Sequence, residues 1–119
     1  MKFIYIISLL CSLISLNVHA FNVTFRLQMT GVNVFTTPEV NGTFNNWCGA
    51  CNPLNDADGN GVWETTIQLP AGYFEYKFAA DNWAQQESLA VGAACTATTG
   101  SFTNRTLNVN ADVLLPIVC

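Results

Sequence analysis

Alternating apolar and polar residues in three segments restrict what this chain can fold into. The segments are Val23–Met29, Val62–Leu69 and Phe74–Ala80. A period of two places the apolar residues on one face of a β-strand, whereas a helix needs a period near 3.6. Threonine and asparagine supply 24 of the residues after position 20, a composition that favours sheet surfaces and turns over helices.

Turn residues suggest how these strands connect. Pro70–Gly72 is expected to turn the chain, so that Val62–Leu69 and Phe74–Ala80 form a hairpin. Two more short strands are expected at Leu107–Val109 and Val113–Val118, with the last one returning antiparallel beside the one before it.

Helical periodicity is weak and is confined to Asn82–Val91, which would form one or two turns at most. Short alternating strands in a chain of this length predict an all-β fold. We expect an immunoglobulin-like antiparallel β-sandwich.

The first twenty residues have the pattern of a signal peptide. Lys2 supplies a positive charge, an apolar run follows, and Val18-His19-Ala20 resembles a cleavage site. The run is shorter than the ~20 residues that span a bilayer, which argues against a membrane anchor. We therefore expect residues 1–20 to be removed and residues 21–119 to form one secreted or periplasmic domain.

Loss of the signal peptide would also remove the only histidine, His19. Mechanisms that need an imidazole base or a histidine zinc ligand are then excluded. Three basic residues remain against eight acidic ones, a net charge of −5, so nucleic acids and anionic membranes are poor partners. We expect a domain with no catalytic activity, no metal and no cofactor.

Four cysteines follow the signal peptide: Cys48, Cys51, Cys95 and Cys119. An even number in an exported domain predicts two disulfides. We expect Cys48 to pair with Cys51, and Cys95 with Cys119, because the last strand should return beside Leu107–Val109. A helix starting at Cys48 would instead indicate a redox-active dithiol, but a turn sequence follows Cys51.

The spacing of Asp56, Asp58, Asn60 and Gly61 matches the first half of an EF-hand calcium loop. The glutamate expected at position twelve is replaced by Ile67, a predicted core residue. We expect a tight acidic turn that binds calcium weakly or not at all.

The three tryptophans differ in their surroundings. Trp63 lies on the apolar face of a strand and is predicted to be core. Trp47 and Trp83 follow small and polar residues and do not extend an apolar face. Aromatic rings at turns among amides suit stacking on a sugar ring, although such rings also cap the ends of a sandwich.

Five motifs follow one another in the second part of the chain: Val40–Trp47, Gly61–Glu64, Leu69–Gly72, Tyr73–Phe78 and Asp81–Trp83. In this order they resemble the glycogen-binding module of AMP-activated protein kinase. Family 48 carbohydrate-binding modules and the early-set domains of starch-debranching and branching enzymes share this order. The resemblance covers Val40 to about Val109.

The resemblance implies an early-set β-sandwich that binds a glucan polysaccharide without catalysis. By position, Trp47 and Trp83 match the two tryptophans that stack on the glucan. Lys77 and Asn104 match the residues that bond its hydroxyl groups. The cysteines and the first strand are closer to modules fused to secreted glycoside hydrolases, including β-glucanases, so α- and β-glucans both remain candidate ligands.

A structural spacer of the same fold is the alternative function. Such a domain would pack against a glycoside hydrolase and bind no glycan. Exposed, coplanar indoles of Trp47 and Trp83 would favour binding, and burial of both would favour the spacer.

Overall fold

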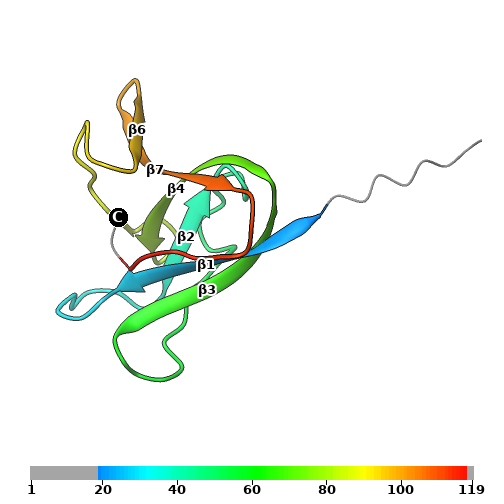
Figure 1. Cartoon of the computed structure of the whole chain (residues 1–119). Coiled ribbons are helices and arrows are strands. Elements are labelled where there is room, and N and C mark those ends of the chain that lie inside the picture. The colour runs from blue at the N-terminus through cyan, green and yellow to red at the C-terminus, as the bar shows by residue number, and fades with distance from the viewer. Residues whose placement is uncertain (1–18, 118–119) are drawn as a thin grey trace, which may run out of the picture.

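The computed structural model describes residues 19–117, which form two β-sheets that face each other (Figure 1). One sheet has the strand order β3-β1-β8, and the other has the order β2-β4-β7-β6, with β5 paired to β4. The strands are β1 (Ala20–Gln28), β2 (Pro38–Gly42), β3 (Val62–Pro70), β4 (Gly72–Ala80), β5 (Gln85–Gln86), β6 (Thr96–Thr99), β7 (Phe102–Val109) and β8 (Val113–Leu114). The predicted β-sandwich is confirmed.

Asn82–Val91 forms turns around β5 and contains no helical turn. Within residues 19–117, no helix is long and apolar enough to cross a bilayer.

The core lies between the sheets and is built from the inward faces that the alternation predicts. Val23 and Phe25 of β1 have no exposed surface, and neither has Val40 of β2. The Phe25 ring contacts Phe44 and Tyr76, with centroid separations of 5.4 and 5.1 Å. Phe25 is therefore at the centre of an aromatic cluster that joins the two sheets.

Trp63 lies at the margin of this core. Its side chain is half-buried, packs partly against the core residues, and meets Phe35 edge to face at 5.6 Å. The prediction of a core tryptophan is thus correct only in part, because Trp63 packs against the core but is not fully buried.

The predicted hairpin between Val62–Leu69 and Phe74–Ala80 is wrong. β3 pairs antiparallel with β1, and β4 pairs with β2 and β7 in the opposite sheet. The turn after Pro70 therefore carries the chain from one sheet to the other. Two strands with apolar faces can pair or can face each other across a core, and the alternation is the same in both cases.

The last strand also differs from the prediction. β8 covers only Val113–Leu114 and pairs in parallel with β1, so it does not lie beside β7. Cys119 lies outside the described residues, and Cys95 has an exposed thiol with no disulfide among them. The pairing of Cys95 with Cys119 stays a prediction. The antiparallel return of the last strand beside β7, which suggested this pairing, is not found.

The acidic segment forms the predicted tight turn. The Asp56 carboxylate accepts hydrogen bonds from the backbone N–H groups of Asn60 and Gly61, at 3.1 and 3.0 Å. Asp58 also accepts from Asn60, at 3.2 Å. These carboxylate oxygens close the turn onto its own backbone.

Candidate functional site

One outer face of the β2-β4-β7-β6 sheet carries the predicted site residues. On β4, Tyr76 and Phe78 point into the core, so Lys77 between them points outward. On β7, Leu107 and Val109 are buried, which places Asn104 on the outward face. Lys77 and Asn104 therefore lie on the same outer face of this sheet.

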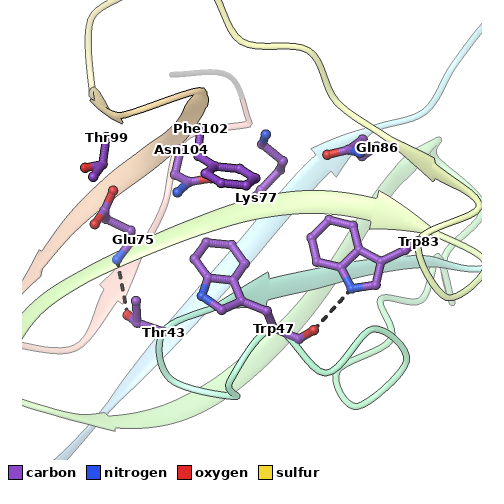
Figure 2. A pocket seen from close by; sticks show the side chains of 9 residues that line it. All are labelled: Thr43, Trp47, Glu75, Lys77, Trp83, Gln86, Thr99, Phe102 and Asn104. Carbon is purple, nitrogen blue, oxygen red and sulfur yellow. Dashed lines mark hydrogen bonds between the residues drawn. The ribbon is translucent and has the colours of Figure 1, made fainter.

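Two turns place the tryptophans over the same face. Trp47 lies in the turn after β2, and Trp83 lies in the turn after β4. A pocket of about 620 Å³ brings these four predicted residues together, as Figure 2 shows. Its lining residues are Thr43, Trp47, Glu75, Lys77, Trp83, Gln86, Thr99, Phe102 and Asn104.

The two indoles form a tilted pair. Their ring centroids are 6.5 Å apart and their planes meet at 36°. The Trp83 indole N–H donates to the carbonyl oxygen of Trp47 at 3.2 Å, which links the two turns. Both side chains are half-buried, so they are neither the fully exposed coplanar pair nor the buried pair that the two alternative functions predict.

The backbone at both tryptophans is in the left-handed region. Trp47 has φ 56° and Trp83 has φ 67°, and in each turn the preceding residue, Asn46 or Asn82, is left-handed too. A bulky residue with positive φ is an outlier that its surroundings must hold in place, at a cost of about 1 to 3 kcal/mol. Such conformations concentrate at functional sites.

A disulfide and a hydrogen bond hold the loop that carries Trp47 in place. The predicted disulfide between Cys48 and Cys51 is confirmed. Between them, the Gly49 N–H donates to the buried Asn41 side chain at 2.6 Å. Gly49 has φ 86°, and a Cβ there would overlap the Asn82 side chain, so only glycine fits where this loop meets the Trp83 turn.

No helix begins at Cys48, where the chain is a loop and turn. The structure therefore lacks the helix N-terminus on which the redox interpretation of Cys48 and Cys51 depends.

The polar groups of the pocket suit a ligand with many hydroxyl groups. Lys77 donates hydrogen bonds, Glu75 accepts them, and the amides of Gln86 and Asn104 do both. Across residues 19–117, the side chains of His, Cys, Asp and Glu form no group of three or more that could hold a metal ion.

Sequence reasoning missed Phe102, whose side chain is 69% exposed on the pocket side of β7. Figure 2 shows its ring near Lys77 and Asn104, across the pocket from the indoles. The available signal was the spacing: Phe102 stands two positions before Asn104, so both side chains point to the same face of an extended strand. The buried residues Glu39 and Asn41 were also missed, because nothing in the sequence shows that a loop covers the outer face of β2.

Comparison with known proteins places these features in a family. The family described as "Glycogen recognition site of AMP-activated protein kinase" matches residues 21–113, which is most of the chain. A search of curated proteins found no match. The matched region contains the two tryptophan turns, all nine residues that line the pocket, and both sheets except Ala20 and Leu114 at the ends of their strands. The chain therefore belongs to this family of glycogen-recognition domains.

Proposed function

We propose that the domain binds a glucan chain in this pocket, with sugar rings stacked on Trp47 and Trp83. Lys77 and Asn104 then bond the sugar hydroxyls, and Phe102 contacts the ligand from the opposite side. The observation that carries the proposal is the convergence of these residues, from β4, β7 and two separate turns, on one pocket. Aromatic surface with a few polar groups is the usual design of such sites.

The tilt of the indoles favours an α-glucan. In an α-1,4-linked chain the planes of successive rings turn, because the chain curves. A flat ribbon such as cellulose requires rings in one plane, and the 36° between the indole planes does not provide it. We therefore propose starch or glycogen as the ligand.

Affinity electrophoresis in gels that contain starch, glycogen, laminarin or cellulose tests this proposal. We expect retardation by starch and glycogen and none by cellulose, relative to a gel without polysaccharide. A dissociation constant between about 1 mM and tens of micromolar is expected, because a few stacking contacts and exposed hydrogen bonds are opposed by the cost of association.

The other outcomes are equally informative. Retardation by laminarin alone would identify a β-glucan ligand. Migration unchanged by every polysaccharide would contradict the proposal and support the structural spacer, which would pack against a glycoside hydrolase.

We further propose that the protein is secreted or periplasmic after removal of residues 1–20. β1 begins at Ala20, and Ala20 is paired with Pro70 at the end of the ladder. Cleavage after Ala20 therefore removes only one residue from the sheet. Intact mass spectrometry of the exported protein should give a chain that starts at Phe21 with no alkylatable thiol. Recovery of the uncleaved chain would contradict this prediction.

A further inference from the structure

A buried carboxylate, that of Glu39, contacts the turn that carries Trp83. Glu39 is on β2, between the inward-facing residues Pro38 and Val40, so its side chain points to the outer face of the sheet. This is the face that carries the pocket, yet Glu39 is only 1% exposed. A charged side chain is buried to this extent only when hydrogen bonds replace its contacts with water.

The partners of Glu39 belong to the Trp83 turn. One carboxylate oxygen accepts the backbone N–H of Trp83 at 3.0 Å, and the other accepts that of Asn82 at 3.2 Å. Each N–H thus has its own oxygen. A carboxylate offers two acceptor oxygens, whereas the amide of glutamine offers one oxygen and an NH₂ group that can only donate.

The turn needs such support. Asp81, Asn82 and Trp83 have φ values of 55°, 56° and 67°, three successive left-handed residues without a glycine. This arrangement is unfavourable for L-residues beyond a single position. Successive N–H groups in a tight turn also form a concave, positively polarised surface that binds an anion, and the Glu39 carboxylate occupies it.

The start of the same turn is held separately. The Asp81 carboxylate accepts the backbone N–H groups of Thr36 and Thr37, with shortest distances of 2.9 and 2.7 Å. Asp81 therefore ties the turn to the segment before β2, and Glu39 ties the part of the turn that carries the indole of Trp83.

We propose that Glu39 is a positioning residue that sets the orientation of Trp83 and hence the angle between the two indoles. Loss of its second acceptor oxygen releases one N–H of the turn, and the indole then leaves the position where it bonds the carbonyl of Trp47. The consequence for glucan affinity rests on the function proposed above; the consequence for the indole angle does not.

The test replaces Glu39 with glutamine in the oxidised, exported protein. Two indoles at this distance couple their electronic transitions, so near-ultraviolet circular dichroism without ligand reports their mutual angle. We expect Glu39→Gln to change this signal strongly and to weaken binding to glycogen by roughly tenfold, the effect of one charge-assisted hydrogen bond. Glu64→Gln, an exposed carboxylate on β3, is the matched control and should leave both readouts unchanged.

Each result is decisive. If Glu39→Gln folds and keeps both the wild-type dichroism and the wild-type affinity, the inference is wrong. If the variant does not fold, Glu39 holds the sandwich rather than the turn, and the inference is wrong as well. If the variant changes the dichroism while the wild-type protein itself binds no glucan, that result would support the positioning role of Glu39 and contradict the proposed function.

Discussion

Replacement of Phe25 with alanine is expected to lower the free energy of unfolding by about 3 to 5 kcal/mol. Phe25 has no exposed surface, and its ring touches Phe44 and Tyr76 across the sandwich. Alanine would leave a cavity between two sheets whose backbones are fixed by their own ladders. Because small domains are stable by only about 5 to 15 kcal/mol, this loss is a large fraction of the total stability.

Urea denaturation followed by tryptophan fluorescence measures this change. Val91→Ala removes apolar surface from a side chain that is 77% exposed, and should alter the stability by less than about 0.5 kcal/mol. If Phe25→Ala were no more destabilising than Val91→Ala, the core would not be centred between the two sheets as described.

Alanine at Trp47 or at Trp83 is expected to weaken glucan binding at least tenfold in each case. Each indole offers one stacking surface, and tenfold corresponds to about 1.4 kcal/mol, well within the contribution of a partly desolvated aromatic contact. Because both side chains are only half-buried, the cost in stability should be smaller, about 1 to 2 kcal/mol. Affinity electrophoresis in glycogen and thermal melting measure the two effects separately.

The control for the tryptophan variants is Tyr73→Ala. Tyr73 is 54% exposed, lies on β4, and does not line the pocket. Its loss should leave the affinity unchanged. Equal loss of binding in all three variants would show that any exposed aromatic ring contributes and that the pocket is not the site.

The strands that carry a long alternation could be predicted from the sequence, whereas their partners could not. β1, β3 and β4 have the predicted faces and nearly the predicted ends. The alternation defines which side of a strand is apolar, but a strand paired in the same sheet and a strand across the core satisfy it equally. β2 and β6 have four or five residues, too few for a period to be recognised.

Only the site residues that match residues of the family could be predicted from the sequence. Trp47, Trp83, Lys77 and Asn104 do lie at one pocket, and their roles in binding stay a prediction. Phe102 was missed because no motif contains it. The support from Glu39 was missed for a different reason, because the burial of a polar residue on an outer face depends on a loop that closes over it.

The buried amide of Asn41 has a consequence for how the protein is produced. Asn41-Gly42-Thr43 is an acceptor sequence for N-linked glycosylation, which attaches a sugar to the side-chain nitrogen. That nitrogen is buried with no hydrogen-bond partner among residues 19–117, while the side-chain oxygen holds Gly49. A glycan at this position would keep the Cys48–Cys51 loop from closing over β2. In a glycosylating host, we therefore expect native protein only from chains whose Asn41 is left unmodified.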